Sequence, residues 1–211
     1  MKITLPDDVK QIIETLEQHG YEGYAVGGCV RDSILGRIPN DWDITTSATP
    51  QQVKKLFPRT VDTGIQHGTV TVLMGKEGYE VTTYRVDGEY EDARHPKEVT
   101  FTANLEEDLR RRDFTINAMA YNDSEGLVDV FGGRADIEQK VIRCVGNAEE
   151  RFGEDALRIM RAVRFRHSSD LRSIRTRQKR RKSWRGRSQR SVPSVSRRSW
   201  SNCWFPHIRI I

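Results

Sequence analysis

A pair of glycines, followed about a dozen residues later by two aspartates, constrains the fold of this chain more than any other feature. Gly27 and Gly28 follow a short strand pattern over 24–26, and residues 30–35 have the spacing of a short helix. A glycine turn between a strand and a helix offers backbone N–H groups to a phosphate. Arg31, near the start of that helix, can reach the same anion. This segment therefore predicts a phosphate-binding turn.

Of the two aspartates, Asp43 begins a second strand predicted over 43–46, and Asp41 lies two residues before it, in the extended chain that enters the strand. Alternate residues of a strand point to the same side, so the two carboxylates project into one small volume. Like charges this close are unfavourable unless a cation neutralises them, and carboxylate oxygens suit Mg²⁺ or Mn²⁺. An Asp-x-Asp alone is more often a solvated turn. Together with the glycine turn it favours a metal beside a bound phosphate, as phosphoryl and nucleotidyl transfer require.

A second polar motif runs over residues 110–118. Asp113 and Asn117 are spaced to share one face of a helix. A carboxylate can accept hydrogen bonds from ribose hydroxyls, and an amide can both donate and accept. Arg112 can make a forked contact with phosphate oxygens. The ordinary alternative is a solvated basic face of a surface helix.

The third motif lies on a strongly helical segment over 149–165. Asp155, Arg158, Arg161 and Arg164 recur every three residues, so they form one polar ridge on a helix. A surface helix with ion pairs between successive turns is the ordinary interpretation. The functional interpretation gives the ridge to a nucleotide, with Asp155 and Arg158 at a base edge and Arg161 and Arg164 on a triphosphate.

The apolar spacing over residues 1–165 predicts a mixed α/β (α+β) fold. Helices are expected over 7–19, 30–35, 47–57, 105–111 and 116–121, strands over 24–26 and 43–46, and a hairpin formed by 69–74 and 79–85. The segment 87–97 has no periodicity and is expected to be a mobile loop. We therefore expect a head domain over 1–146, with a small mixed sheet flanked by helices. The first helix of an all-α neck is expected over 147–165.

The charges of the chain divide at about residue 165. Residues 166–211 hold 14 Lys and Arg and one acidic residue, whereas residues 1–165 hold 21 basic and 29 acidic residues. The basic balance belongs to the tail, so it gives no evidence of RNA binding by the head. The three widely spaced cysteines indicate neither a disulfide framework nor a zinc site, and fit a cytoplasmic setting. No apolar run approaches the roughly 20 residues that span a bilayer, so we expect no membrane partner.

Taken together, the three motifs resemble those of the class II tRNA nucleotidyltransferase and bacterial poly(A) polymerase family, most closely its CCA-adding members. The resemblance covers about residues 20–165. Further segments that match the family's pattern are 63–70, 79–85 and 129–133. The expected fold is therefore that of a nucleotidyltransferase head followed by the start of a helical neck.

The resemblance implies a role for each matching residue. Asp41 and Asp43 are implied to be the catalytic carboxylates that bind Mg²⁺ or Mn²⁺, with Glu80 in support. The residues implied to bind the nucleotide are Gly28, Arg31, Arg112, Asp113, Asp155, Arg158, Arg161 and Arg164, with Gly27 and Asn117 as possible supporting residues.

The activity that the resemblance implies is addition of C-C-A to the 3′ end of tRNA from CTP and ATP. The RNA 3′-hydroxyl attacks the α-phosphate with two metal ions bound, and pyrophosphate is released. The nearest alternative is a poly(A) polymerase that uses ATP alone on RNA 3′ ends. An inactive, truncated RNA-binding fragment is an alternative from another class. No oligomeric state follows from the sequence.

Residues 166–211 depart from the family pattern, which continues with helices that grip the tRNA acceptor arm. They are rich in Arg, Ser and Trp and have no sustained helical period. One interpretation is a natural basic RNA-binding tail. The other is a reading-frame shift after about residue 165, because permitted codons for 166–177 and 198–211, read one base out of register, encode family-like segments. We expect the tail to be disordered, and the activity of the 211-residue product stays open.

Overall fold

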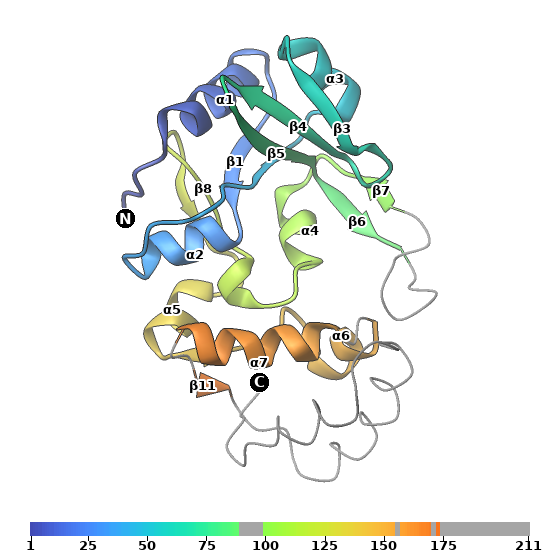
Figure 1. Ribbon diagram of the computed structural model, residues 1–211. Helices are drawn as coiled ribbons and strands as arrows, with labels where there is room; N and C mark the ends of the chain where they lie inside the picture. Colours follow the sequence, from blue (N-terminus) through green and yellow to red (C-terminus); the bar gives the residue numbers. More distant parts are fainter. Residues whose placement is uncertain (89–98, 155–156, 170–171, 174–211) are drawn as a thin grey trace.

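The computed structural model describes residues 1–88, 99–154, 157–169 and 172–173 (Figure 1). Its centre is a seven-stranded sheet. The strands of this sheet are β1 (Gly23–Val26), β2 (Ile44–Thr46), β3 (Thr60–Gly64), β4 (Thr69–Met74), β5 (Glu77–Thr83), β8 (Ala120–Asn122) and β9 (Gly126–Val128). Their order is β3-β4-β5-β2-β1-β8-β9. The pairs are antiparallel except β2 and β5, which run parallel.

Helices and two small sheets complete the described structure, with α6, α7 and β11 lying together below the central sheet (Figure 1). The α-helices are α1 (Asp7–Gln18), α2 (Gly28–Ile34), α3 (Pro50–Leu56), α4 (Leu105–Arg110), α5 (Gly133–Glu138), α6 (Ala148–Glu154) and α7 (Leu157–Ser169). Two single turns of 3₁₀-helix are η1 (Ile65–His67) and η2 (Thr115–Asn117). The small sheets pair β6 (Arg85–Asp87) with β7 (Val99–Phe101), and β10 (Val141–Ile142) with β11 (Arg172–Ser173).

The main core lies between the sheet and the helices α1 and α3. The buried face of α1 is formed by residues spaced three and four apart, which confirms the helix predicted from this spacing. They join apolar side chains that alternate along β4 and β5 in one cluster: Val9, Ile12, Ile13, Leu16, Val70, Val72 and Val81. A capping box between Thr49 and Gln52, with Pro50 in the first turn, starts α3.

The opposite face of the sheet carries a second, smaller cluster under α4. Along β1, Ala25 belongs to the main core, whereas its neighbours Tyr24 and Val26 belong to the second cluster, as the period of a strand requires. Leu109 of α4 and the fully buried Tyr84 complete the contact. These contacts fix α4 beside β1 and β2, where the polar motifs meet.

The mixed sheet flanked by helices confirms the predicted fold class. The expectation of a helix over 116–121 is wrong, because this segment contains the end of η2 and the strand β8. Its apolar run is compatible with either structure, and pairing of β8 with β1 decides for the strand. The strands β3 and β9 and the small sheet of β6 and β7 were not predicted.

The segment expected to be one helix over 149–165 is divided into α6 and α7, and residues 155–156 between them lie outside the described part. Helix α7 continues to Ser169, beyond the expected boundary at residue 165, and β11 then pairs in parallel with β10. Of the loop expected over 87–97, Asp87 is instead the last residue of β6, and residues 89–97 lie outside the described residues, as does the rest of the tail, 174–211. Within the described ranges, no helix is long and apolar enough to cross a membrane.

Candidate active site

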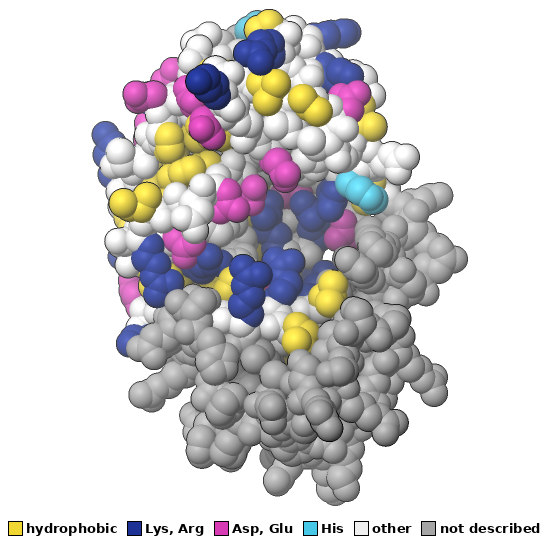
Figure 2. Space-filling model, in the orientation of Figure 1, with side chains coloured by type: hydrophobic (Ala, Val, Ile, Leu, Met, Phe, Trp, Pro, Cys, Tyr) yellow, Lys and Arg dark blue, Asp and Glu magenta, His cyan; other side chains and the backbone are white. Residues whose placement is uncertain are grey.

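A cavity of about 570 Å³ lies where β1 and β2 meet α2, α4 and α7. Figure 2 shows it as a hollow with Lys and Arg side chains inside and Asp and Glu side chains along its upper rim. The predicted site residues that line it are Gly27, Gly28, Arg31, Asp41, Asp43, Arg112, Asp113, Asn117, Arg158, Arg161 and Arg164. Glu80 does not line the cavity, and Asp155 lies outside the described residues. Residues from three separate sequence motifs therefore converge on one cavity.

The glycine turn joins β1 directly to α2. Gly27 has φ 82° and ψ −123°, a backbone conformation that residues other than glycine rarely adopt. Its N–H donates to the Met119 carbonyl at 3.2 Å, which extends the pairing of β1 with β8. A Cβ atom at Gly27 would lie 3.2 Å from Nη1 of Arg112. The absence of a side chain therefore permits both the turn and the close approach of this arginine.

The two predicted metal-binding carboxylates lie in the loop that enters β2. The strand begins at Ile44, so the expectation that Asp43 begins the strand is wrong. The pairing of β1 with β2 nevertheless reaches Asp43, because the Val26 N–H donates to the Asp43 carbonyl at 2.9 Å. Both aspartates are exposed and line the cavity. Backbone hydrogen bonding thus fixes the position of Asp43.

The carboxylate of Asp43 is in an unfavourable electrostatic environment. Desolvation within the cavity raises its pKa, Glu80 and Asp41 raise it further, and Arg112 opposes the rise. Glu80 is close because the parallel register pairs Ile44 with Val81, which aligns the preceding residues of β2 and β5. A cation at this point would relieve the repulsion.

The donor set fits a hard divalent ion that also binds substrate oxygens. Among the described residues, no group of three His, Cys, Asp or Glu side chains is arranged to hold a metal ion. Mg²⁺ commonly binds proteins through one or two carboxylates and takes further oxygens from substrate phosphates and water. Asp41 and Asp43 can supply these two carboxylates.

Arg31 is held rigidly at the start of α2. Its guanidinium makes a forked contact with Asp32, with Nε and Nη2 at 3.0 and 2.8 Å from the two carboxylate oxygens. Its Nη1 donates to Oδ1 of Asn117 at 2.6 Å. The guanidinium carbon lies 4.9 Å from the ring centre of Phe165 in α7, a cation–π distance. The residue expected to bind phosphate is thus oriented by three elements.

Asp113 continues this network towards α7. The predicted helix through Asp113 and Asn117 is absent, but the two side chains still meet, because Asn117 Nδ2 donates to Asp113 Oδ1 at 3.2 Å. The other oxygen, Oδ2, lies 2.9 Å from Nε of Arg161. Asp113 is 6% exposed, whereas the Arg161 side chain is 55% exposed. The ion pair therefore fastens an exposed arginine of α7 to a buried carboxylate of the head.

A buried carboxylate of α4, Asp108, organises the neighbouring arginines. It is wholly inaccessible, and its oxygens accept from Nε of Arg111 at 2.8 Å and from Nη2 of Arg112 at 3.1 Å. The Thr45 hydroxyl of β2 also donates to it, at 3.2 Å. Burial alone would raise the pKa of Asp108, but Arg112 and Arg111 outweigh burial and lower it. Asp108 thus links the strand that follows Asp43 to two arginines of the cavity.

The two remaining arginines of the ridge on α7 differ in exposure. Arg158 is 6% exposed, and its Nη1 and Nη2 donate to the carbonyls of Arg151 and Arg111 at 3.0 and 3.5 Å. Arg164 is exposed at the cavity. Arg158 is therefore positioned by head and neck backbone together, while Arg164 is accessible to a ligand.

Several residues of the cavity were not predicted from the sequence: Cys29, His67, Arg85, Asp87, Arg111 and Phe165. Arg85 and Phe165 each end a segment used for the resemblance, but no local pattern indicated that they face the same space. Burial raises the pKa of the Cys29 thiol to about 11, and this thiol donates to the Val26 carbonyl. The only sequence signal for Arg111 was its place in a run of three arginines.

The fold and the cavity together define a class of protein. A mixed sheet bearing a carboxylate pair, a glycine turn and an arginine-lined cavity is the head domain of a nucleotidyltransferase. The chain belongs to the poly A polymerase head domain family, whose sequence profile matches residues 23–143.

Two curated relatives of high similarity are CCA-adding enzymes. The chain is 61% identical over 156 residues to the CCA-adding enzyme of Lactiplantibacillus plantarum, which covers 74% of this chain and 38% of that enzyme. It is 57% identical over 154 residues to the CCA-adding enzyme of Geobacillus stearothermophilus, with 73% of this chain and 38% of that enzyme covered. The chain thus spans about two fifths of the length of these relatives.

Solved structures agree. The crystal structure of the Bacillus stearothermophilus CCA-adding enzyme in complex with CTP superposes with a TM-score of 0.73 and 49% identity, over 80% of this chain and 41% of that one. An apo form of a CCA-adding enzyme superposes with a TM-score of 0.73 and 25% identity, over 96% of this chain and 57% of that one. The described fold is therefore that of one part of such enzymes.

Proposed function

We propose that this chain carries the catalytic head of a CCA-adding enzyme, which adds C and A to the 3′ end of tRNA from CTP and ATP and releases pyrophosphate. The observation that carries this proposal is the convergence of the carboxylate pair, the glycine turn and the arginines of α7 on one cavity. The similarity to CCA-adding enzymes, one of them solved with CTP, supports it. The same proposal divides the chain into a head domain over 1–146, a first neck helix over 147–165 and a tail over 166–211.

The residues of the cavity divide the work of binding. Asp41 and Asp43 would hold Mg²⁺ or Mn²⁺, and a pair of such ions, when bound, would supply activation of the attacking hydroxyl and neutralisation of charge on the leaving group. Arg31 and Arg164 would bind the phosphates of the incoming nucleotide with charge-assisted hydrogen bonds. Because Asp32 and Asn117 already orient the Arg31 guanidinium, little reorganisation is needed when the phosphates arrive.

Two further contacts concern the sugar and the base. Asp113 is proposed to accept a hydrogen bond from the ribose. Arg161 pairs with this carboxylate in the described structure. It would therefore have to leave Asp113 in order to bind the triphosphate. Arg158, with Asp155, is proposed to recognise the base edge of CTP or ATP. Side chains would thus take the part that a template strand plays in other polymerases.

A poly(A) polymerase that uses ATP alone on RNA is the second candidate. The description of the matching family, a poly A polymerase head domain, favours it. The cavity residues discussed above are compatible with either nucleotide preference. Selectivity between CTP and ATP separates the two candidates. A cytoplasmic setting with tRNA as partner belongs to the leading proposal.

Incorporation of CMP and AMP into a tRNA lacking its 3′-terminal C-C-A tests the function. The leading proposal expects both nucleotides to be added in a metal-dependent reaction, with Asp41→Ala reducing the rate to background. Incorporation of AMP without CMP would support the poly(A) polymerase instead. Unchanged incorporation by Asp41→Ala would refute the catalytic assignment.

The same assay compares the 211-residue chain with a version restored to the reading frame predicted for its tail. We expect the frame-restored chain to add nucleotides faster, because the family's helices after the neck grip the tRNA. RNA binding without incorporation by either version would favour the non-catalytic interpretation. Its affinity should then fall steeply with salt.

A further inference from the structure

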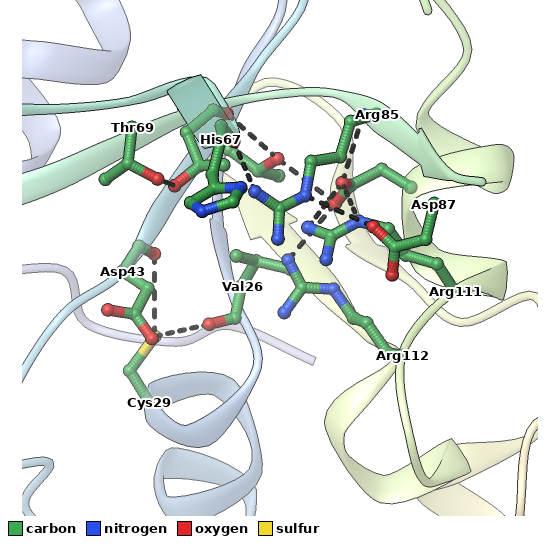
Figure 3. Close-up of polar contacts among 12 residues, drawn as sticks. Val26, Cys29, Asp43, His67, Thr69, Arg85, Asp87, Arg111 and Arg112 are labelled. Atoms are coloured by element: carbon green, nitrogen blue, oxygen red, sulfur yellow. Dashed lines mark hydrogen bonds and ion pairs between the residues drawn. The ribbon is translucent and has the colours of Figure 1, made fainter. Parts of the chain in front are cut away.

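Arg85 is a cavity residue that none of the sequence motifs explains. It starts β6, directly after the buried Tyr84, and its backbone N–H donates to Oδ1 of Asp108 at 3.3 Å. Its side chain is 18% exposed and lines the cavity. Nη1 donates to the His67 carbonyl, and Nε lies 3.5 Å from Oδ1 of Asp87 (Figure 3). The guanidinium is thus fixed in position at the cavity wall.

Positive charge exceeds negative charge around Arg85. Figure 3 shows Arg85, Arg111 and Arg112 grouped on one side of the close-up and Asp43 on the other. One buried carboxylate, Asp108, accepts hydrogen bonds from both Arg111 and Arg112. Burial lowers the pKa of Arg85, and the neighbouring Arg111 lowers it further. These three guanidinium groups face two carboxylates, Asp108 and Asp87, so one positive charge remains in excess and would be stabilised by an anion.

Unsatisfied donors are present at the same place. The Nε atoms of Arg85 and Arg112 are buried, and neither has a hydrogen-bond partner among the described residues. A buried guanidinium N–H without an acceptor is unfavourable, because the group has lost its water. An oxyanion that enters the cavity brings several acceptors at once and matches the forked geometry of arginine.

This group of arginines differs from the one that the family resemblance singles out on α7. Arg161 and Arg164 come from α7, which crosses below α4 in Figure 1, whereas Arg85 comes from β6 on the sheet side of α4. Across the whole cavity, seven arginines face four aspartates. This excess of positive charge can accommodate more than one phosphate group.

We propose that Arg85 and Arg111 form an additional phosphate-binding subsite of this cavity, separate from the arginines of α7. The chemistry it recognises is a phosphate oxyanion, either the outer end of a nucleoside triphosphate or a phosphodiester of the RNA strand. The identity of these two sources rests on the proposed function. The subsite itself rests on the grouping of these guanidinium groups and on the unsatisfied Nε atoms of Arg85 and of the neighbouring Arg112.

Binding of three probes to the 211-residue chain tests the subsite: inorganic tripolyphosphate, CTP and a short single-stranded RNA. Arg85→Gln should weaken at least one of them about tenfold, the loss expected for charge-assisted hydrogen bonds. Loss for tripolyphosphate and CTP identifies the triphosphate as the source, and loss for RNA alone identifies the phosphodiester. Arg134→Gln, at an exposed arginine of α5 paired with Glu138, removes the same charge outside the cavity and should leave all three affinities within twofold.

Arg85→Lys guards against a variant that simply fails to fold, and Arg111→Gln tests the second arginine. Arg85→Lys keeps the charge and should lose less affinity than Arg85→Gln. Arg111→Gln should weaken the same probe as Arg85→Gln. Unchanged binding of all three probes by folded Arg85 and Arg111 variants, or no binding by the parent chain, would overturn the subsite.

The proposed function is tested by a different result. A chain that incorporates no nucleotide but loses tripolyphosphate binding on Arg85→Gln has the subsite without the function. A chain that incorporates CMP and AMP and whose Arg85 variants bind every probe normally has the function without the subsite.

Discussion

At the scale of single residues, Gly27 shows how one backbone conformation permits the site. Its positive φ turns the chain from β1 into α2, and its missing side chain leaves room for Arg112. A residue with a side chain in this sparsely populated region of backbone space is unfavourable by about 1–3 kcal/mol. Strain and the displacement of an arginine would therefore occur together at this position.

We expect Gly27→Ala to lower the free energy of unfolding by about 2 kcal/mol and to weaken CTP binding, because Cβ would lie against Arg112. Urea unfolding and calorimetric titration measure the two effects. Gly20→Ala is the matched control, since Gly20 also has φ 82° but no neighbouring atom within 4 Å of the added Cβ. It should lose stability and keep its affinity. Equal loss of affinity in both variants would contradict the contact argument.

Cys29 allows a second test at this scale. Burial raises the pKa of its thiol to about 11, and that of Cys144 to about 12, so both thiols stay protonated at neutral pH. Since the thiolate is the reactive species, we expect neither to react with a disulfide reagent at pH 8 in the folded protein. A Cys203→Ser variant removes the third thiol. Both thiols should react on addition of denaturant, and fast labelling without it would contradict their burial.

At the scale of elements, the contacts of Asp108 connect α4 to the sheet and to the two arginines that follow the helix. Asp108 accepts from two arginines and from Thr45 of β2 while fully buried. Removal of one partner from such a group leaves uncompensated buried charge, at a cost of about 3 kcal/mol. The position of α4, and with it that of the cavity arginines, depends on this carboxylate.

We predict that Asp108→Asn destabilises the protein by about 3 kcal/mol at pH 7 and that the difference from the parent shrinks in acid. The pKa of Asp108 is lowered in the folded state, so its contribution is complete above the unfolded value of about 4 and is lost as the pH falls through the folded value. Urea unfolding of the parent and the variant from pH 7 to pH 3 measures the destabilisation and its dependence on pH. A difference that is constant over this range would show that the charge of Asp108 is not the cause.

At the scale of the whole molecule, α7 is attached to the head through the site itself. Phe165 makes an edge-to-face contact with Phe114, with ring centres 5.9 Å apart, and lies under the guanidinium of Arg31. Arg161 pairs with Asp113. The proposed binding residues of α7 and of the head therefore fix each other's positions.

Phe165→Ala should lower the free energy of unfolding by about 2 kcal/mol, less than a fully buried phenylalanine would, because this ring is only partly buried. It should also weaken CTP binding, since α7 carries part of the cavity. Arg164→Ala, on the same helix but exposed, is the control for stability and should change it by less than about 0.5 kcal/mol. Equal stability of Phe165→Ala and the parent would contradict the docking of α7 through this ring.

The sequence by itself determined the features that depend on local geometry. The turn at Gly27 and Gly28, the spacing of Asp41 and Asp43, and the helical ridge of α7 all follow from the preferences of neighbouring residues. The helices α1, α2 and α3 and the strands β1 and β2, which lie in the first 56 residues, were therefore predicted nearly in full. The resemblance added roles to these residues, and the structure brings all the described ones except Glu80 to one cavity.

Only the tertiary structure decided the features that depend on contacts between distant residues. Pairing with β1 made a strand of β8, where local periodicity also suited a helix, and parallel pairing of β2 with β5 brought Glu80 beside Asp43. Arg31 meets Asn117 across 86 residues of sequence. Arg85 lines the cavity because its strand, β6, comes directly after β5 and lies beside α4. Local preferences act over a few residues, whereas strand pairing and burial of charge are settled when the whole chain packs.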